Sequence, residues 1–329
     1  MTGRLTGRLT GRAMSSYPPI DLIRPRLATS DCLEGATGEH RHGTLYAVLR
    51  THTPVRALTP ADRDEALALC ARDPASNCFV AGRIDEGALY SMPGALLGVP
   101  GDDGALRALA WASANLVPVE CDAASLDAIA AKVRRWRRHC ASIFGPIDQV
   151  AGLWDRLGPA WGPARTIRRE QLLMSTGVDP GDWGVTIDAR VRPATMDELD
   201  LVVPAAAAMF TEEIGYPPFV GSSANYRAVV SGLIRSGRTF VWVDRGRVLF
   251  KADVGSVGVD AAQIQGVWLA PHLRGQGLAT PLMAAVTSAV LRGVASEATL
   301  YVNDFNAAAI ATYEAVGFRR VGTFATVLL

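Results

Sequence analysis

The segment from Val267 to Ala279 is the part of the sequence best suited to bind a ligand. An apolar run with strand character leads into a turn that contains Arg274, Gly275 and Gly277, and an apolar helical pattern follows. Glycines let the backbone approach a ligand without a Cβ in the way. Because N–H groups in such a turn and at the N-terminus of a helix attract anions, this pattern predicts a seat for a pyrophosphate group.

Two better-known phosphate-binding motifs do not fit this turn. No Gly-Lys-Ser/Thr follows it, which excludes a Walker loop. Thr280 stands where the dinucleotide-binding motif needs its third glycine, and no acidic partner for a ribose follows at the usual distance. A lone Gly-x-Gly turn also suits a tight structural connection between a strand and a helix. A second pattern is needed to decide between that role and phosphate binding.

That second pattern lies between Asn303 and Phe318. Asn306 and Tyr313 are seven residues apart, which places them on one face of a helix, two turns from each other. The small Ala309 between them allows close packing. A tyrosine at such a position serves either as a core aromatic or as a proton donor, and the spacing leaves both roles open.

Together the two patterns resemble the signature of the GNAT superfamily of N-acetyltransferases. The family motif R/Q-x-x-G-x-G/A stands here as residues 274–279. In the family this motif is followed by a strand and then by Asn, Ala, Tyr and Gly-Phe. The corresponding residues here are Val302, Asn306, Ala309, Tyr313 and Gly317-Phe318. The whole chain is similar to two-lobed actinobacterial members of this family, whose N-terminal lobe has no assigned function.

The resemblance implies a mixed sheet whose two parallel central strands, near Val267 and Tyr301, splay apart to admit the pantetheine arm of acetyl-CoA. It implies direct transfer of the acetyl group to a small-molecule amine or a protein amino group, with Tyr313 protonating the departing thiolate. It implies no metal. The residues expected to bind acetyl-CoA are Val267, Trp268, Leu269, Arg274, Gly275, Gln276, Gly277, Leu278, Ala279, Asn306 and Ala309.

The general base is the part of the site that the resemblance does not supply. Many family members carry a Glu on the strand before the glycine-rich turn, but here that strand carries Gln263 and Gln265, which accept a proton poorly. The remaining acids are Glu212, Glu213 and Asp253. Glu213 is our candidate base because it precedes a Gly-Tyr-Pro-Pro loop in the segment where the family usually binds its acceptor. A water-mediated base is equally open.

Patterning in the C-terminal half predicts alternating strands and helices, and therefore an α+β fold with a mixed sheet. A hairpin is expected around the Asp-Arg-Gly turn at 244–246. The apolar segment 201–210 is predicted to form a buried helix. The expected strands are 239–243, 248–254, 263–269, 298–302 and 324–328, and the expected helices are 278–291 and 306–316.

Similar passages in the two halves indicate a duplicated domain. Residues 55–62 and 191–198 have similar sequences, and in each a short strand leads into a helix capped by threonine. Each half also ends on a helix with an aromatic residue four positions before a glycine. We expect these glycines, Gly158 and Gly317, to end their helices in the left-handed conformation.

The first copy lacks the residues that carry the chemistry, and we interpret it as a degenerate lobe. No Gly-x-Gly precedes its strand at 142–144, and Trp154 in place of Tyr313 has no hydroxyl group. A strand over 169–174 is expected to close this lobe. The basic cluster at 134–139 fits a solvated helix face better than a site for RNA or another anion.

Three segments follow from these patterns. Residues 1–52 repeat Thr-Gly-Arg-Leu and are predicted to be disordered or to precede the true start of the protein. Residues 53–176 form the degenerate lobe, and residues 187–329 form the catalytic domain that binds acetyl-CoA.

Bulk composition excludes several classes of protein. The formal net charge of +1 gives no reason to expect a nucleic-acid partner, and no apolar run approaches the roughly 20 residues that span a bilayer. We therefore expect a cytoplasmic protein. Its five cysteines are scattered and form no C-x-x-C, which predicts neither a disulfide framework nor a zinc site.

Alternative functions stay open from the sequence. The chain could be a non-catalytic CoA-binding sensor or interaction module, or an acetyltransferase similar to mycothiol synthase. A nucleic-acid-associated protein would use the N-terminal segment and the basic cluster at 134–139, and its binding would depend steeply on salt.

Overall fold

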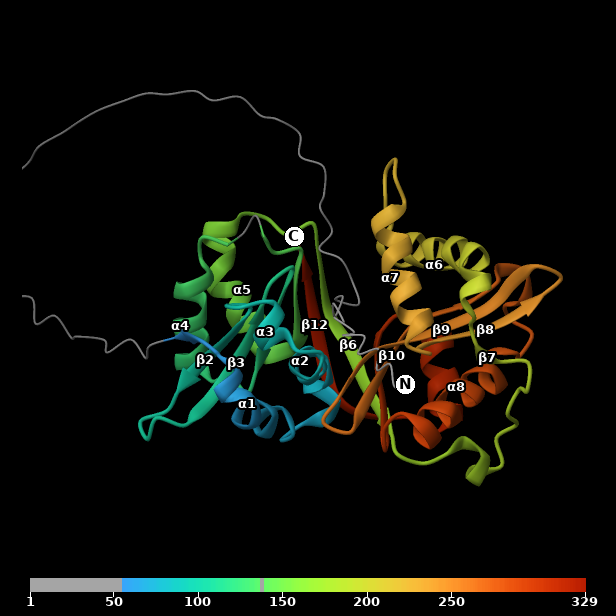
Figure 1. Cartoon of the computed structure of the whole chain (residues 1–329), viewed down its shortest axis with the longest axis horizontal. Helices are drawn as coiled ribbons and strands as arrows, with labels where there is room; N and C mark the ends of the chain where they lie inside the picture. Colours follow the sequence, from blue (N-terminus) through green and yellow to red (C-terminus); the bar gives the residue numbers. More distant parts are fainter. Residues whose placement is uncertain (1–54, 137–138) are drawn as a thin grey trace, which may run out of the picture.

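The computed structural model describes residues 55–136 and 139–329, in which twelve strands form one mixed sheet (Figure 1). The strand order is β1-β2-β3-β4-β5-β12-β6-β11-β10-β9-β8-β7. The sheet runs through two lobes, so the predicted mixed α+β fold is confirmed. The predicted N-terminal extension, residues 1–52, lies outside the described residues, as does part of the basic cluster. Within the described ranges, no helix has the length and apolar composition needed to cross a bilayer.

The elements of the first lobe are β1 (Arg56–Ala57), η1 (Pro60–Asp62), α1 (Arg63–Cys70), α2 (Pro74–Asp85), α3 (Ala88–Ser91), β2 (Leu96–Pro100), β3 (Leu106–Ala112), β4 (Asn115–Val119), α4 (Ala123–Val133), β5 (Ser142–Pro146), α5 (Ile147–Trp161) and β6 (Thr166–Thr176). Those that follow are η3 (Pro180–Trp183), β7 (Arg192–Pro193), η4 (Met196–Glu198), α6 (Leu199–Ile214), α7 (Ala224–Arg235), β8 (Thr239–Asp244), β9 (Arg247–Gly258), β10 (Ala261–Leu269), η5 (Pro271–Leu273), α8 (Ala279–Gly293), β11 (Glu297–Asn303), α9 (Ala307–Val316) and β12 (Arg319–Leu328).

The two lobes repeat one order of elements. Each begins with a short strand, a 3-10 turn and helices (α1 to α3 in the first lobe, α6 and α7 in the second), and continues with antiparallel strands. Each then has one parallel pair joined by a crossover helix, β4 with β5 in the first lobe and β10 with β11 in the second. In the second lobe α6 and α7 cover one face of the sheet and α8 covers the other (Figure 1). The repeated order supports the predicted duplication.

The helix starts of the two lobes repeat in atomic detail. In the second lobe the Thr195 N–H donates to Glu198 Oε2 at 3.0 Å, and Arg192 Nη2 donates to Glu198 Oε1 at 2.6 Å. In the first lobe Asp62 takes the place of the glutamate and Arg56 the place of the arginine. Each carboxylate satisfies a backbone N–H at the helix start and also holds the preceding strand through its arginine. The shorter aspartate performs the same function, so the similar passages in the sequence reflect similar structures.

This cap gives the fold a measurable dependence on pH. The hydrogen bond from Arg192 lowers the pKa of Glu198 to about 2. A carboxyl whose pKa is lowered by folding adds stability above its unfolded pKa of about 4.3, and that stability is lost as the pH falls toward 2. We expect Glu198→Gln to lower the free energy of unfolding by about 1 kcal/mol near neutral pH, because the neutral amide loses the ion pair with Arg192 and the negative charge at the start of the helix.

Urea denaturation at several pH values measures this effect. The difference in free energy of unfolding between the parent protein and Glu198→Gln should narrow as the pH falls from about 5 toward 3. Over this range the Glu198 carboxyl becomes protonated in the unfolded chain. Glu314→Gln, at an exposed position in α9, serves as the control and should show little difference at any pH. A gap that stays constant with pH would contradict this account of the cap.

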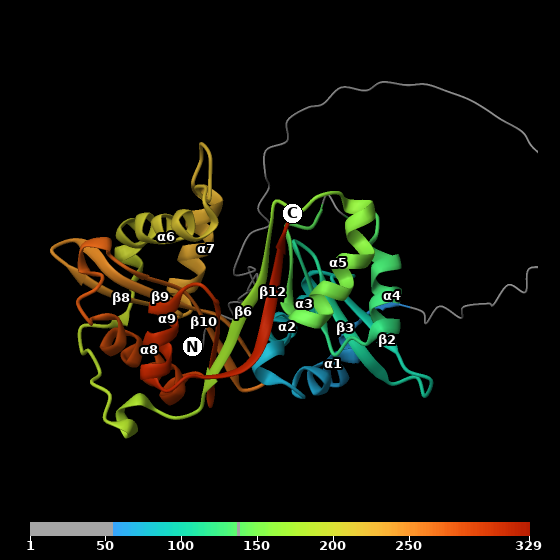
Figure 2. The same ribbon diagram turned by 180° about the vertical axis from the view of Figure 1, so that it is seen from behind.

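The last strand of each lobe is exchanged, which corrects the predicted role of residues 169–174. β6 contains them but does not close the first lobe. It lies between β12 and β11, while β12 lies between β5 and β6, so that Leu328 pairs with Ser142 and Asn303 pairs with Gln171. Both strands run through the middle of the molecule, between the lobes (Figure 2). Strand partners this far apart in sequence leave no local pattern, which is why the exchange escaped prediction.

The glycine predicted to end the first-lobe helix is also corrected. Gly158 lies inside α5, which continues to Gly162, where φ is 77°. The indole of Trp154 lies 3.3 Å from the point where a Cβ of Gly158 would be. Close packing, not a helix stop, therefore explains this glycine. Gly317, with φ of 105°, ends α9 as predicted.

Helix α2 of the first lobe packs onto the second lobe. Its Gly82 faces β9 so closely that an added Cβ would lie 2.9 Å from the Val257 carbonyl oxygen. The buried thiol of Cys78 donates to the Ala261 carbonyl at 3.2 Å, at the start of β10. All the cysteines in the described residues carry free thiols. The first lobe thus buttresses the strands that form the candidate site.

Candidate functional site

Strands β10 and β11 separate in the middle of the sheet. They pair in parallel only between Ala261–Gln263 and Glu297–Thr299. Beyond these residues β10 stays with β9, while β11 stays with β6 to its end. The two strands are therefore unpaired toward their carboxyl ends, and the glycine-rich turn follows the end of β10. This agrees with the divergence expected near Val267 and Tyr301.

A bulge in β10 marks the start of the split. Gly266 has a φ of 59°, and the register with β9 shifts between Gln265 and Trp268. Lys251 on β9 donates from Nζ to the Gly266 carbonyl oxygen at 3.3 Å and also binds the Asp253 carboxylate. Only 1% of the Lys251 side chain is exposed, so this ion pair is part of the core that supports the bulge.

Asp253 does not meet the requirements for a general base. Its Oδ1 accepts from the Thr239 hydroxyl at 2.9 Å, and its Oδ2 accepts from Lys251. The side chain is only 4% exposed. A carboxylate with both oxygens engaged inside the core cannot contact the acceptor amine. Asp253 is therefore excluded as the general base.

The glycine-rich turn has the backbone geometry of an anion seat. Gly275 and Gly277 both have a φ of 73°, a conformation that side chains other than glycine rarely adopt. The space where their Cβ atoms would lie is open. Among the described residues, no acceptor meets the N–H groups of residues 275–277. The 15-residue helix α8 begins directly after them, so its dipole adds to the attraction for an anion.

Arg274, predicted to add positive charge to this turn, is held by a carboxylate. Its Nη2 donates to Glu212 Oε2 at 2.7 Å, and its Nε donates to the Leu269 carbonyl at 2.9 Å. Glu212 also accepts from Trp268 Nε1 at 3.2 Å. Arg274 and Glu212 are both close to half exposed, so an incoming anion can compete for the guanidinium. Glu212 is therefore a partner of the turn.

The corresponding connection of the first lobe, residues 120–122, has no equivalent seat. Only Glu120, Cys121 and Asp122 connect β4 to α4, whereas residues 270–278 connect β10 to α8. Asp122 caps α4, and the Cys121 N–H is already bonded to the side chain of Gln149 at 2.9 Å. Two carboxylates in a short connection repel an anion. This connection is consistent with our interpretation of the first lobe as degenerate, which stays a prediction.

Tyr313 lies in α9, beside the split. Its ring packs 6.0 Å from that of Phe318, measured between centroids, and the residue is 8% exposed. Burial, and to a lesser degree the Glu213 carboxylate, raises the pKa of Tyr313 above its usual value. Within the described part of the chain its hydroxyl has no hydrogen-bond partner, so a protonated phenol is available to a ligand.

Asn306 occupies a different position from the one predicted. It does not lie on a helix face with Tyr313 but precedes α9 as its N-cap. Its Oδ1 accepts from the Ala309 N–H at 3.2 Å. The spacing of seven residues spans the cap and two turns of helix, which sequence alone could not distinguish from two turns within the helix.

Glu213 lies in the last turn of α6 and is paired with a residue of the other lobe. Arg168 of β6 donates from Nη1 to Glu213 Oε1 at 3.2 Å and from Nη2 to the Glu213 main-chain oxygen at 2.7 Å. The Glu213 side chain is half exposed, so one side of its carboxylate faces solvent.

The fold brings together most residues predicted from the two motifs. One apolar cluster contains Val267 and Leu269 of β10, Leu278 before α8, and Ala309 and Tyr313 of α9. Trp268 points to the opposite face, toward the cluster formed by α6 and α7. Sequence reasoning missed two charged residues, Arg168 and Lys251. A lysine two residues from an aspartate inside a largely apolar strand was a usable signal, whereas nothing local marked the arginine.

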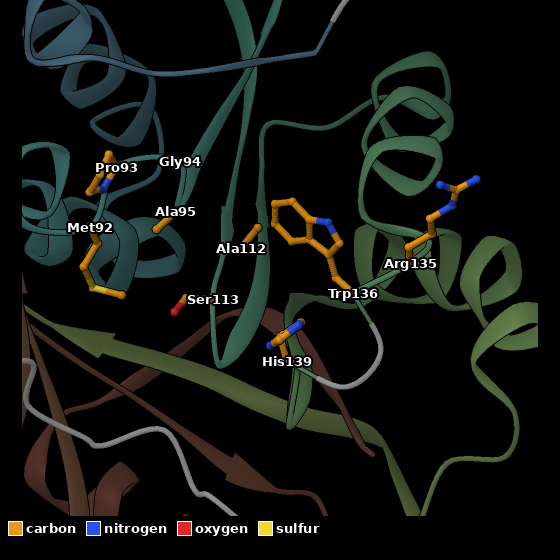
Figure 3. A pocket seen from close by; sticks show the side chains of 9 residues that line it. All are labelled: Met92, Pro93, Gly94, Ala95, Ala112, Ser113, Arg135, Trp136 and His139. Atoms are coloured by element: carbon orange, nitrogen blue, oxygen red, sulfur yellow. The ribbon is translucent and has the colours of Figure 1, made fainter. Parts of the chain in front are cut away.

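A separate hollow of about 610 Å³ lies in the first lobe (Figure 3). Trp136, Arg135 and His139 line one side of it, and the segment around Met92 and Ser113 lines the other. None of its residues belongs to either motif. Within the described residues, no group of three or more side chains is arranged to hold a metal ion.

Comparisons with known proteins agree with this arrangement. Residues 211–318 match the Acetyltransferase (GNAT) family, and residues 94–202 match a domain of unknown function, DUF4081. No curated protein matches the chain.

Solved structures are similar over most of the chain but distant in sequence. A Drosophila protein is 13% identical, with 84% of this chain and 98% of that chain covered and a TM-score of 0.59. A GCN5-related N-acetyltransferase from Sphaerobacter thermophilus is 16% identical, with 83% and 93% covered and a TM-score of 0.52. A tandem GNAT protein from the clavulanic acid biosynthesis pathway is 15% identical, with 83% and 98% covered and a TM-score of 0.50. At this identity the similarity shows the fold alone, which is that of tandem GNAT proteins.

Proposed function

Because the C-terminal part of the chain is a GNAT acetyltransferase domain preceded by DUF4081, we propose that it transfers an acetyl group from acetyl-CoA to an amine. The observation that carries this proposal is the split between β10 and β11, which opens onto an anion seat at the start of α8 and lies beside a buried tyrosine. A strand–turn–helix connection with a purely structural role would need neither the split nor the unbonded N–H groups.

The residues around the split fit acetyl-CoA. The N–H groups of Gly275, Gln276 and Gly277 would hold the pyrophosphate, with Arg274 alongside. The backbone of β10 at Val267 and Leu269, no longer paired with β11, would hold the pantetheine arm. The same proposal includes Trp268, Leu278, Ala279, Asn306 and Ala309 in the surroundings of the cofactor. When bound, acetyl-CoA supplies an activated acyl group on a thioester.

In the proposed reaction two side chains move protons. The acceptor nitrogen loses a proton to Glu213, directly or through water, and forms a bond to the acetyl carbon while the carbon–sulfur bond breaks. Tyr313 gives its proton to the departing sulfur. Its raised pKa keeps the phenol protonated until that point. Glu213 is preferred to Glu212 because both oxygens of Glu212 are engaged, by Trp268 and Arg274, whereas among the described residues only Oε1 of the Glu213 carboxylate accepts a hydrogen bond. It is preferred to Asp253 because the latter is buried.

Turnover of acetyl-CoA with a panel of amines tests the proposal. The panel should include small amines, polyamines, aminoglycosides, lysine side chains and peptide amino termini, with detection of free thiol. Release of CoA that depends on one class of amine would support transfer and name the acceptor. Binding of acetyl-CoA without turnover by any amine would instead favour a CoA-binding module.

We expect each chain to bind one acetyl-CoA. The first lobe has a short acidic connection where the second has its anion seat, and Gln149 already occupies the Cys121 N–H there. Isothermal titration calorimetry on the full chain measures the stoichiometry. A value near two would contradict the assignment of the first lobe as degenerate.

Glu212 is expected to oppose cofactor binding. Its carboxylate neutralises Arg274 and lies beside the seat, so Glu212→Gln should tighten acetyl-CoA binding by about two- to fivefold, the range expected for an exposed ion pair. The glutamine keeps an oxygen for Trp268. Calorimetry measures the Kd, and Glu213→Gln, one residue further along α6, is the matched control with an unchanged Kd. A weaker affinity in Glu212→Gln would show that the carboxylate positions Arg274 for the cofactor.

A further inference from the structure

The structure suggests a role for the first lobe through strand β6. Arg168, near the start of this strand, contacts Glu213 twice, through the carboxylate and through the main-chain oxygen. The second contact places a cation at the C-terminal end of α6, where it interacts favourably with the helix dipole. The Arg168 side chain is only 13% exposed, so it is held firmly between the lobes.

A buried polar contact fixes the register that places Arg168 there. Gln171, three residues further along β6, is 1% exposed. It accepts from the Thr326 hydroxyl on β12 at 2.6 Å and donates to Asn303 on β11 at 3.1 Å. Because both neighbouring strands are bonded to one side chain, β6 cannot slip along either of them without breaking a buried hydrogen bond.

The exchange of strands is what brings this lobe to the site. If β6 had paired with β5 at the edge of its own lobe, β12 would separate it from the split. Instead β6 pairs directly with β11, one of the two strands that form the split. Arg168 of β6 therefore reaches Glu213 at the C-terminal end of α6.

Glu213 lies within electrostatic reach of both tyrosines beside the split. After burial, its charge is the next contribution that raises the pKa of Tyr301, to about 12, and it also contributes to the raised pKa of Tyr313. The orientation of the Glu213 carboxylate, the base of the proposed reaction, depends on its contacts with Arg168.

We propose that Arg168 is a positioning residue for acyl transfer, through which the lobe without a cofactor seat completes the site of the other lobe. This inference rests on the proposed function. Arg168 holds the Glu213 carboxylate and the last turn of α6 in place, and the carboxylate takes the proton of the acceptor amine. Arg168 does not itself contact the reacting atoms.

Steady-state kinetics on the full chain, with the best amine from the panel, test this role. Arg168→Gln should lower kcat on the order of 10- to 100-fold, the effect expected when a reacting group is misplaced by about 1 Å. The Kd of acetyl-CoA, measured by calorimetry, should not change. Arg168→Lys should recover part of the rate, because it restores the charge but not the two-point contact. Arg169→Gln changes the neighbouring, exposed arginine and should have no effect on the rate.

A double-mutant cycle separates positioning from general support of the fold. If Arg168 acts through Glu213, Arg168→Gln should add little to the loss already caused by Glu213→Gln. Independent losses that multiply would overturn the proposal, as would an unchanged kcat in Arg168→Gln. An unmodified chain that binds acetyl-CoA but transfers nothing would contradict the proposed function and this inference with it. If the parent chain is active and Arg168→Gln leaves kcat unchanged, only this inference is contradicted.

Discussion

Replacing Gly277 with aspartate is expected to weaken acetyl-CoA binding by on the order of 100-fold or more. The new carboxylate would lie in the open space of the anion seat, next to the pyrophosphate. Two like charges about 4 Å apart near a protein surface repel by about 4 kcal/mol, and each 1.4 kcal/mol corresponds to about tenfold in Kd. Calorimetry on the folded variant measures the loss.

Gly277→Asn is the matched control for this variant. Asparagine has the shape of aspartate and tolerates a positive φ comparatively well, so it introduces the same bulk and similar backbone strain without the charge. Asn should therefore bind acetyl-CoA much more tightly than Asp. Equal losses in both variants would point to strain, and no loss in either would remove the turn from the cofactor site.

Tyr313→Phe is expected to slow acyl transfer by roughly 10²–10⁴-fold, the usual contribution of a positioned general acid. The ring packs in the cluster formed by β10, β11, α8 and α9, and phenylalanine preserves that packing. The fold and the Kd of acetyl-CoA should therefore be unchanged. Single-turnover measurements isolate the chemical step from product release.

Tyr226→Phe controls for the loss of a buried tyrosine hydroxyl. Tyr226 is 9% exposed, close to the value for Tyr313, but it lies in α7 within the cluster on the other face of the sheet. It should leave the rate of transfer nearly unchanged. If Tyr313→Phe turns over as fast as the parent, the tyrosine is only a core aromatic, and another group such as a water protonates the sulfur.

The parts of the fold that could be predicted from the sequence are those set by neighbouring residues. Several features depend only on contacts within a few residues, and their residue types predict them. They are the turn at Gly275 and Gly277, the end of α9 at Gly317 and the helix caps at Thr59 and Thr195. These features sufficed to mark the turn that we propose as the anion seat and to indicate the duplication of the domain.

The parts that could not be predicted depend on contacts between distant residues. Nothing near Arg168 indicates that it meets Glu213, and nothing near Arg274 indicates that Glu212 neutralises it. The wrong role given to Gly158 has a different cause. Trp154 lies only four residues earlier in the same helix, and the sequence does not show that α5 continues past the glycine with the indole packed against it. Motif spacing identifies what a segment can do, but tertiary contacts decide which charges are free to do it.

The exchanged strands also set an order of events for a chain emerging from the ribosome. β5 is made long before β12, yet in the finished sheet Ser142 pairs with Leu328, and the Leu329 N–H donates to the Ala141 carbonyl at 3.0 Å. Until the final strand emerges, β5 presents an unpaired edge, which is a hazard for aggregation. The two lobes therefore mature together, and the high contact order of this pairing predicts a slow final step of folding.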